Sequence, residues 1–347
     1  MSLLQQYSLI LGYTILTGVI VAEITLRIKG GYYLSYDGPE SEYLSPYNDK
    51  TMWPRTMFSN TSFETKTAEF TYANQFNSTG VRDVEHDIAN KQKDCRILLL
   101  GDSFTEGVGS RMEESWSSKL EPLINVDTGL TIRIMNAGFA GADPIYCYEF
   151  FEKKMSEYSP ELVILVLNGS DPVDFMVRGG RERYNDDGTL IYKDRPGMEY
   201  LFSKSHLCRF ILMRVFDYDW LLISPGEKAA RIKEAELIMT ECISRFQRHT
   251  SESNMDFMVV LHPFSSDLIN GQYDFDYSYL ESNLASNKVP YLDLFDHFDR
   301  NIEEGKVFEY YWENDGHLTP KGNELFASGM GQYLIENVGF TSSLTGN

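Results

Sequence analysis

Five short apolar segments, separated by stretches of helical character, constrain the fold of this chain more than any other feature of its sequence. The segments are RILLLG at 96–101, TIRIMNA at 131–137, LVILVLN at 162–168, MDFMVVLHP at 255–263 and VPYLDLF at 289–295. Helices are expected at 113–124, 144–157, 226–249 and 319–337. Nearly continuous apolar strands that alternate with helices predict a parallel sheet covered on both faces. The expected fold class is therefore α/β, a three-layer αβα sandwich with a sheet of about five strands and an N-terminal apolar helix.

The N-terminus carries an uncharged apolar run over residues 7–22, which Glu23 interrupts before the pattern continues. A transmembrane helix needs about 20 apolar residues, and a signal peptide needs a basic start and a small-residue cleavage site that this run lacks. We interpret residues 1–29 as a membrane anchor helix, with a buried core helix as the alternative. Arg27 and Lys29 after the run favour a cytoplasmic position for the rest of the chain, so the sequence leaves the orientation open.

Two polar stretches complete the expected domain organisation. Residues 30–94 show little helical periodicity and are interpreted as a linker with a partly β lead-in segment. Residues 95–340 are expected to form the main domain. Within it, residues 172–220 break the alternation of strands and helices, and Asp187-Gly188 is a favourable hairpin turn. We expect this insertion to form a cap over the site.

Charge and cysteine content narrow the classes of partner and cofactor. The formal net charge of -20 disfavours binding to the phosphate backbone of nucleic acids. The four cysteines include no CxxC pair, so a zinc or redox motif is not indicated. Four cysteines are also too few for a disulfide framework in a chain of 347 residues.

Three of the expected strands are followed by short polar motifs, and parallel strands place such motifs at one edge of the sheet. GDSFTEG at 101–107 puts Ser103 at the start of a helix, where free N–H groups favour a nucleophile whose attack creates an oxyanion. NAGFAGAD at 136–143 brings glycines, whose backbone can approach a ligand closely. LNGSD at 167–171 offers the side-chain amide of Asn168. Each motif alone also fits an ordinary turn or helix cap.

A fourth motif, NDGHLTPKG, lies before the last expected helix. Thr319 and Pro320 are typical of an N-cap and a first helical residue, so His317 lies in the preceding loop. Asp315 is two positions earlier, and in an extended loop the two side chains point the same way. The carboxylate can then orient the imidazole as a general base.

In this order, the four motifs resemble the sequence blocks of the SGNH (GDSL-type) hydrolase superfamily. The resemblance extends from about Arg96 to Glu336, and the lead-in ANQFNSTGVRD and the apolar N-terminus resemble those of membrane-anchored bacterial members. Many members carry an aspartate three residues before the histidine, where this chain has Asn314. The shorter spacing of Asp315 matches other members, including the sugar O-acetylation branch. A Ser–His dyad without an acidic partner is the alternative.

The resemblance implies a serine esterase with Ser103 as nucleophile, His317 as general base and Asp315 as its acidic partner. It matches the functional glycine of the family to Gly141, and implies an oxyanion hole made by the N–H groups of Ser103 and Gly141 and the amide of Asn168. No metal and no organic cofactor is required for this chemistry. The implied substrate is a small-molecule or glycan ester, with the acetyl ester as one case.

Two other functions fit the same motifs. A carbohydrate O-acetyltransferase would use the same triad to pass an acetyl group to a glycan, and a non-catalytic glycan-binding relative would retain the fold alone. The presence of Ser103, Asn168 and His317 argues against the non-catalytic relative. His262, after the fourth strand, is a weaker candidate for a direct role, and Asp102 is expected to bond the nearby backbone. The anchor and the resemblance together predict a membrane-attached protein whose catalytic domain is periplasmic or extracellular.

Overall fold

A computed structural model describes residues 2–29, 59–87, 95–128, 131–172, 175, 199–218 and 224–337. The chain forms two compact units. The first, called here the N-terminal unit, consists of Met1–Met52 and Met176–Lys233, and the second, the sheet unit, consists of Trp53–Phe175 and Glu234–Asn347.

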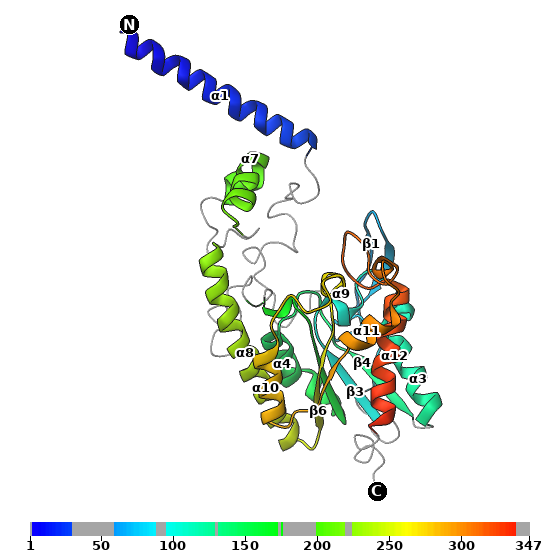
Figure 1. Ribbon diagram of the computed structural model, residues 1–347. Helices are drawn as coiled ribbons and strands as arrows, with labels where there is room; N and C mark the ends of the chain where they lie inside the picture. The colour runs from blue at the N-terminus through cyan, green and yellow to red at the C-terminus, as the bar shows by residue number, and fades with distance from the viewer. Residues whose placement is uncertain are drawn as a thin grey trace. The chain divides into compact units, whose positions relative to one another are not determined.

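The sheet unit is built on a five-stranded parallel sheet, as the apolar segments predict (Figure 1). Its strands are β3 (Cys95–Leu100), β4 (Ile132–Asn136), β5 (Leu162–Leu167), β6 (Asp256–Leu261) and β7 (Tyr291–Asp293). The order across the sheet is β4-β3-β5-β6-β7, so the first strand lies inside the sheet and the chain reverses its direction of winding between β3 and β5. Open sheets of this kind bind ligands beyond the carboxyl ends of the strands at that reversal.

Helices cover both faces of the sheet and confirm the three-layer architecture (Figure 1). One face is covered by α3 (Trp116–Thr128), α11 (Phe295–Asn301) and α12 (Pro320–Glu336), and the other by α4 (Pro144–Lys153), α10 (Ser278–Ser286) and the part of α8 (Pro225–Glu252) that belongs to the sheet unit. Successive side chains of a strand point to opposite faces. Ile97 and Leu99 accordingly pack into one core, and Leu98 and Leu100 into the other.

Sequence signals fix where the main helices begin. Asp143 caps α4 by accepting a hydrogen bond from the backbone N–H of Tyr146, and Thr319 caps α12 in the same way. In both helices proline occupies the first turn, where its missing N–H costs nothing. The shorter helices of the sheet unit are α2 (Ser103–Glu106), η3 (Met112–Glu114), η4 (Met155–Tyr158), α9 (Ser265–Asn270) and η7 (Val307–Glu309).

The lead-in segment contains an antiparallel hairpin of β1 (Ser62–Lys66) and β2 (Thr71–Gln75). After it, the buried Arg82 donates hydrogen bonds to the backbone carbonyls of Glu106, Gly107 and Ser110. The segment that the sequence suggested as a linker with partial β structure therefore includes a side chain that supports the turn after α2. Residues 30–58 and 88–94 of that segment lie outside the described part.

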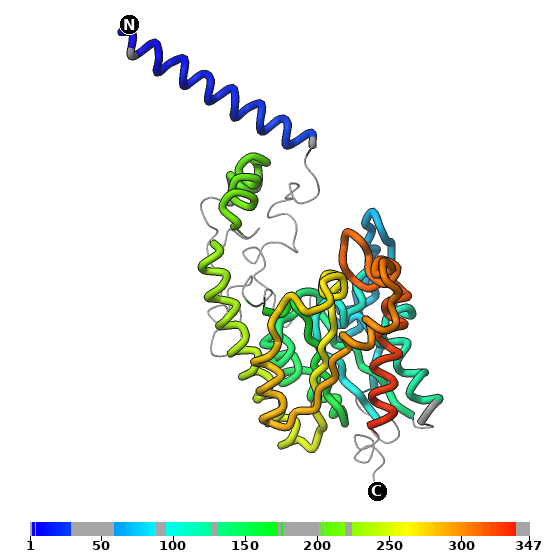
Figure 2. Tube along the Cα trace, viewed as in Figure 1, coloured from blue at the N-terminus to red at the C-terminus, as the bar shows by residue number. Residues whose placement is uncertain are grey.

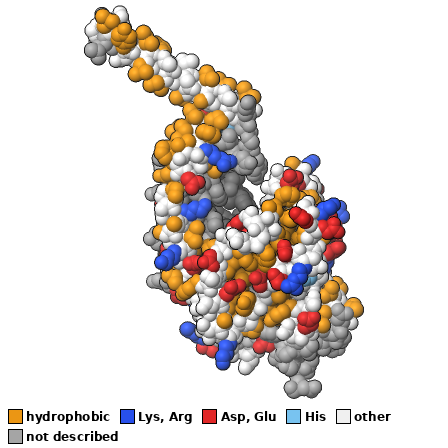
Figure 3. Space-filling view, viewed as in Figure 1, with side chains coloured by type: hydrophobic (Ala, Val, Ile, Leu, Met, Phe, Trp, Pro, Cys, Tyr) orange, Lys and Arg blue, Asp and Glu red, His pale blue; other side chains and the backbone are white. Residues whose placement is uncertain are grey.

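The N-terminal unit contains the helix α1 (Leu3–Lys29), which covers the predicted anchor. Its stretch Gln5–Ile28 is long and apolar enough to cross a membrane, and its apolar side chains are exposed (Figure 3). The unit also contains α6 (Glu199–Lys204), α7 (His206–Phe210) and the π-helical η6 (Ile211–Val215). These belong to the predicted insertion 172–220. The predicted hairpin turn at Asp187 lies outside the described residues.

Candidate active site

The predicted nucleophile lies at the carboxyl end of β3, next to the point where the sheet reverses its winding. Asp102 is the N-cap of α2, and its carboxylate accepts a hydrogen bond from the backbone N–H of Phe104 at 2.9 Å. Ser103 is therefore the first residue of the helix, where a backbone N–H needs no helical partner. The side chain of Asp102 bonds nearby backbone, as the sequence suggested. The turn holds the Ser103 hydroxyl above the sheet with only 7% of the residue exposed.

Ser103, His317 and Asp315 form one continuous chain of hydrogen-bonding distances. The Oγ of Ser103 lies 2.7 Å from Nε2 of His317, and Nδ1 of His317 lies 2.5 Å from Oδ1 of Asp315. With Asp315 ionised, the proton on Nδ1 faces the carboxylate, so Nε2 is free to accept the proton of the serine. The structure thus brings Ser103, at the start of α2, together with Asp315 and His317. Ser103 and His317 are 214 positions apart along the chain.

The loop that carries His317 is held by its own backbone pairing and by contacts with the segment around Ser103. A bridge pairs Tyr311 with Leu318, and the backbone N–H of Trp312 donates to the carbonyl of His317 at 2.8 Å. The indole N–H of Trp312 donates to the carbonyl of Gly109, near the end of the turn that carries the serine. The imidazole of His317 packs against the ring of Phe104, with centroids 4.8 Å apart. These contacts fix the imidazole of His317 relative to the hydroxyl of Ser103.

Glu69, in the turn between β1 and β2, also holds this loop. Its carboxylate accepts hydrogen bonds from the backbone N–H of Asp315 at 2.9 Å and of Asn314 at 3.1 Å, and from the side-chain amide of Asn314. In Figure 2 the hairpin, drawn in blue, lies beside this orange loop. Glu69 could not be identified from the sequence, because no motif connects it with a loop 246 positions away. The preference of the lead-in for strand structure was the only related signal.

The second motif passes very close to α2. A side chain at Gly138 would place its Cβ 2.3 Å from the backbone nitrogen of Glu106, so only glycine fits there. The carboxylate of Glu106 accepts a hydrogen bond from the N–H of Ala140 at 2.6 Å, which fixes the next part of the loop. Gly141 follows with a φ of 69°, in the left-handed region that glycine adopts freely. Its N–H has no partner among the described residues.

Asn168 lies at the same edge but differs from the prediction that its amide faces the substrate. The side chain is fully buried, and its Nδ2 donates to Oδ2 of Asp102 at 2.9 Å. The same nitrogen lies 3.1 Å from Nε2 of His262, which accepts the second amide hydrogen when the imidazole is neutral and carries its proton on Nδ1. In that tautomer both amide hydrogens bond to described residues, and Asn168 supports Asp102.

His262 is fully buried beside Phe104 and is linked to the site through its contact with Asn168. Burial in this apolar surrounding lowers the pKa of His262 to about 4, with a smaller opposing effect from the charge of Asp102. The imidazole is therefore neutral at ordinary pH, and its Nδ1 faces the carbonyl of Pro263. This placement gives His262 a supporting position behind the nucleophile rather than a direct role.

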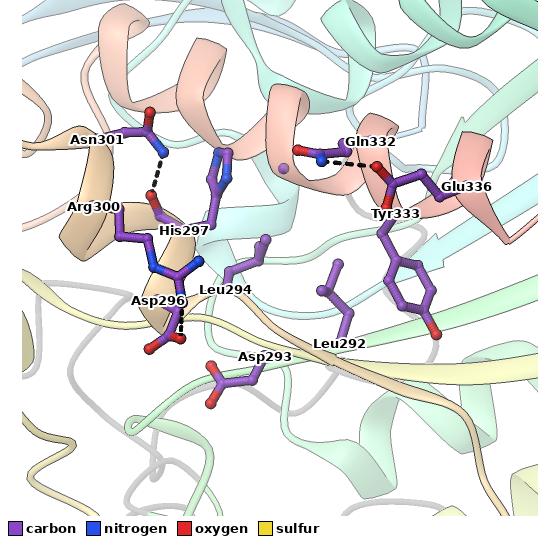
Figure 4. Close-up of a pocket in the computed structure, with 11 residues that line it drawn as sticks. Leu292, Asp293, Leu294, Asp296, His297, Arg300, Asn301, Gln332, Tyr333 and Glu336 are labelled. Atoms are coloured by element: carbon purple, nitrogen blue, oxygen red, sulfur yellow. Dashed lines mark hydrogen bonds and ion pairs between the residues drawn. The ribbon is translucent and has the colours of Figure 1, made fainter.

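A separate open pocket of about 440 Å³ lies between β7, α11 and α12, and contains none of the predicted site residues (Figure 4). Its histidine, His297, has Nε2 within 3.1 Å of the carbonyl of Leu325 and of the Ser328 hydroxyl. The nearby Arg300 pairs with Asp296. Because these polar groups bond one another, the pocket gathers no set of free reactive side chains comparable to that around Ser103.

Solved structures that match this chain include esterases and a GDSL-like lipase, the class that the four motifs resemble. A two-domain esterase active on acetylated mannans matches 71% of this chain and 50% of its own, at 14% identity and a TM-score of 0.42. An acetyl xylan esterase matches 69% and 99%, at 14% identity and a TM-score of 0.45. A GDSL-like lipase from Bacteroides thetaiotaomicron matches 70% and 88%, at 14% identity and a TM-score of 0.36.

This chain thus spans about half the length of the two-domain esterase. No family model and no curated protein matches the sequence. Since the TM-scores of these structures are all below 0.5, the activity of this chain is inferred from the side chains of its own site.

Proposed function

We propose that this protein is a serine esterase that hydrolyses an acyl ester, with the acetyl ester as the first candidate. The observation that supports it best is the unbroken series of contacts from Asp315 through His317 to Ser103. A hydroxyl, an imidazole and a carboxylate in this order are the working parts of a nucleophilic acyl-transfer site. Residues 95–340 would form the hydrolase domain, with the lead-in hairpin as its support.

The proposed reaction follows from the positions of these groups. His317 takes the proton of Ser103 through Nε2 while Oγ attacks the ester carbonyl, and Asp315 stabilises the imidazolium that forms. The alcohol leaves with that proton, and an acyl-serine remains. Water, deprotonated by the same imidazole, then releases the acid and restores the serine.

We propose the backbone N–H groups of Ser103 and Gly141 as the donors to the tetrahedral oxyanion. Ser103 is at a helix start, and Gly141 has no partner for its N–H among the described residues, so neither N–H is used in a bond to that part of the chain. One such donor is typically worth about 3 kcal/mol of activation free energy. The side chain of Asn168 would contribute indirectly, by holding Asp102 at the N-cap.

The test is covalent labelling by a fluorophosphonate probe combined with ester hydrolysis. The full-length protein should carry the label on Ser103, and both label and hydrolysis should disappear in Ser103→Ala and in His317→Ala. Ser156→Ala changes a half-buried serine of η4 whose hydroxyl donates to the backbone carbonyl of Glu152, outside the site, and should keep both. Labelling of another residue, or hydrolysis that survives in Ser103→Ala, would disprove the assignment.

The same assay separates the alternatives that the sequence leaves open. Asp315→Asn should lower kcat by about 10²- to 10⁴-fold if the acidic partner matters, and a dyad would lose little. p-Nitrophenyl acetate, acetylated mannan and acetyl xylan serve as substrates, each with and without a glycan acceptor. Transfer of acetyl to the acceptor in preference to water would identify an O-acetyltransferase.

We also propose that α1 anchors the protein in a membrane and that the sheet unit lies in the periplasm or outside the cell. The helix offers 24 residues of suitable length and composition, and its apolar side chains are exposed to the surroundings. Exposed apolar side chains over a whole helix carry a large cost in water, which a bilayer removes.

A further inference from the structure

Glu23, the one acidic residue of the candidate membrane span, binds the start of another helix in the N-terminal unit. Its carboxylate accepts hydrogen bonds from the hydroxyl of Ser205 at 2.9 Å and from the backbone N–H groups of His206 at 3.1 Å and Leu207 at 2.8 Å. These groups form the first turn of α7, where a negative charge complements the helix dipole. A carboxylate near a bilayer is costly unless it is paired in this way.

Arg27 completes the contact one turn further along α1. Its guanidinium pairs with Glu23 at 2.8 Å and donates a second hydrogen bond to the backbone carbonyl of Lys204 at 2.6 Å. Lys204 ends α6, so the cation lies at a helix C-terminus, where the dipole favours it. The ion pair of α1 thus binds both ends of the turn between α6 and α7, and fixes this turn beside the anchor.

The depth of this contact is set by the geometry of α1. Glu23 lies five residues before Ile28, the end of the candidate span, which corresponds to roughly 8 Å along the helix axis. Amphipathic helices that bind membranes place their apolar face about 5–10 Å into the boundary between headgroups and acyl chains. A helix held at Glu23 therefore lies at the depth of that boundary.

α7, whose first turn binds Glu23, and η6, which follows it directly, carry an exposed apolar face. Phe210, Ile211 and Val215 are exposed, and their positions follow the spacing of one helix face together with Arg214. Phe216 follows with 58% of its surface exposed. Exposed aromatic and aliphatic residues gathered on one face of a helix are typical of helices that lie in the membrane interface.

We infer that residues 199–216 dock on the membrane surface, with Phe210, Ile211 and Val215 between the lipid headgroups beside α1. This inference rests on the proposed anchor and goes beyond it, because it gives the bilayer a second, peripheral contact with the protein. It assigns part of the predicted insertion to the lipid surface. The Glu23–Arg27 pair serves as the connection between the membrane span and the peripheral helix.

Nitroxide labels on the full-length protein in phospholipid vesicles test the inference. One cysteine at a time is introduced at Val215, Ile15 or Val126 in a Cys95→Ser, Cys208→Ser background that keeps only the buried Cys147 and Cys242. The collision rates of each label with oxygen and with a water-soluble nickel chelate are then compared. Ile15 lies in the middle of α1, and Val126 is an exposed residue of the sheet unit. The oxygen-to-nickel ratio at Val215 should be several-fold higher than at Val126, and lower than at Ile15.

The other outcomes distinguish failure of the docking from failure of the anchor. A ratio at Val215 equal to that at Val126, with Ile15 in lipid, overturns the docking of residues 199–216 and leaves the anchor intact. A Val215 label shielded from both reagents means that protein covers this face, which also overturns it. An Ile15 label in water overturns the anchor and the inference with it.

A substitution on α1 tests the connection itself. Glu23→Leu removes the acceptor at the start of α7, and the oxygen-to-nickel ratio at Val215 should fall toward that of Val126, while the ratio at Ile15 stays unchanged. Thr25→Ala is the matched control, because the Thr25 hydroxyl bonds only the carbonyl of Val21 within α1. An unchanged ratio at Val215 in Glu23→Leu would show that the carboxylate does not hold the helix.

Discussion

At the scale of single residues, the site is distinguished by how completely its charged and polar groups are held. Asp102 accepts from Phe104, Asn168 and Ser170, and so its carboxylate is satisfied before any substrate arrives. Asp315 and His317 bind one another. Fixed donors and acceptors need little reorganisation during the reaction, and this is the main physical source of catalysis in such sites.

Glu69 is expected to act as a positioning residue for the base. In Glu69→Ala the loop of Asp315 and Asn314 loses its acceptor, so kcat should fall by about 10- to 100-fold with little change in KM. Steady-state hydrolysis over a range of substrate concentrations measures kcat and KM separately.

Two controls separate this role from a general loss of folding. Glu69→Gln keeps an acceptor oxygen and should recover most of kcat. Glu64→Ala, an exposed residue of the same hairpin, should leave kcat and KM unchanged. If Glu69→Ala kept the kcat of the unchanged protein, the positioning role would be refuted.

His262 is expected to make the folded protein sensitive to acid. Burial lowers its pKa from 6.5 to about 4, so the unfolded chain takes up this proton at a higher pH than the folded one. The stability that depends on the neutral imidazole is complete above about pH 6.5 and falls as the pH decreases toward 4, by at most about 3 kcal/mol. Urea unfolding of the full chain at about pH 7 and about pH 4.5 measures this loss.

The matching variant is His262→Gln, which cannot titrate in this range. Its free energy of unfolding should be lower than that of the unchanged protein near neutral pH, and should change less between the two pH values. An equal pH dependence in both proteins would mean that another group causes the acid sensitivity.

At the scale of elements, the close passage of the loop after β4 over α2 leaves no space for a side chain. Gly138→Ala would place a Cβ against the backbone of Glu106, which has no flexible end that can move away. The free energy of unfolding should decrease by about 1–3 kcal/mol, and hydrolysis should fall because Gly141 and Ser103 separate. Urea unfolding and kcat measure the two effects.

Gly271→Ala is the comparison for this substitution, since a Cβ there meets open space, although its φ of 69° adds some strain. It lies outside the site and should leave kcat unchanged. A Gly138→Ala protein with unchanged stability and kcat would show that the loop and α2 can separate without cost.

The strands and long helices could be predicted because their signals are local. Apolar runs buried on both faces mark β3, β5 and β6, and Thr319-Pro320 marks the start of α12. β7 has only three residues, and its predicted segment was longer because neighbouring apolar residues pack without strand pairing. Element boundaries of this kind depend on tertiary contacts.

The triad residues could be proposed from sequence because each follows a strand or precedes a helix at the same sheet edge. The role of Asn168 could not, because a sequence shows that an amide is present and not where its hydrogens point. That direction depends on Asp102 and His262, which are 66 and 94 positions away. Glu69 was missed for the same reason, since its partners lie in a distant loop.

At the scale of the whole molecule, the chain combines an acidic protein of net charge -20 with an apolar helix. The charge disfavours polyanions as partners. If α1 is the anchor, Leu16→Arg should shift the protein from the membrane fraction to the soluble fraction, because an arginine at the centre of a span costs about 3 kcal/mol. Fractionation of expressing cells followed by immunoblotting measures the shift.

Leu237→Arg provides the control, since Leu237 is an exposed apolar residue on α8. It should leave the distribution between fractions unchanged. Intact mass of the membrane-bound protein distinguishes an anchor, which retains α1, from a cleaved leader. Recovery of a shortened protein in the soluble fraction would show that the segment containing α1 is a cleaved leader and not an anchor.

The order in which the parts of the site occur along the chain determines when a newly synthesised molecule becomes reactive. All five strands of the parallel sheet and Ser103 precede residue 301, whereas His317 and α12 come after it. A ribosome that has just completed α11 has therefore supplied the sheet and the hydroxyl of Ser103, but not the imidazole of His317. On the proposed mechanism, ester hydrolysis can begin only when translation is almost finished.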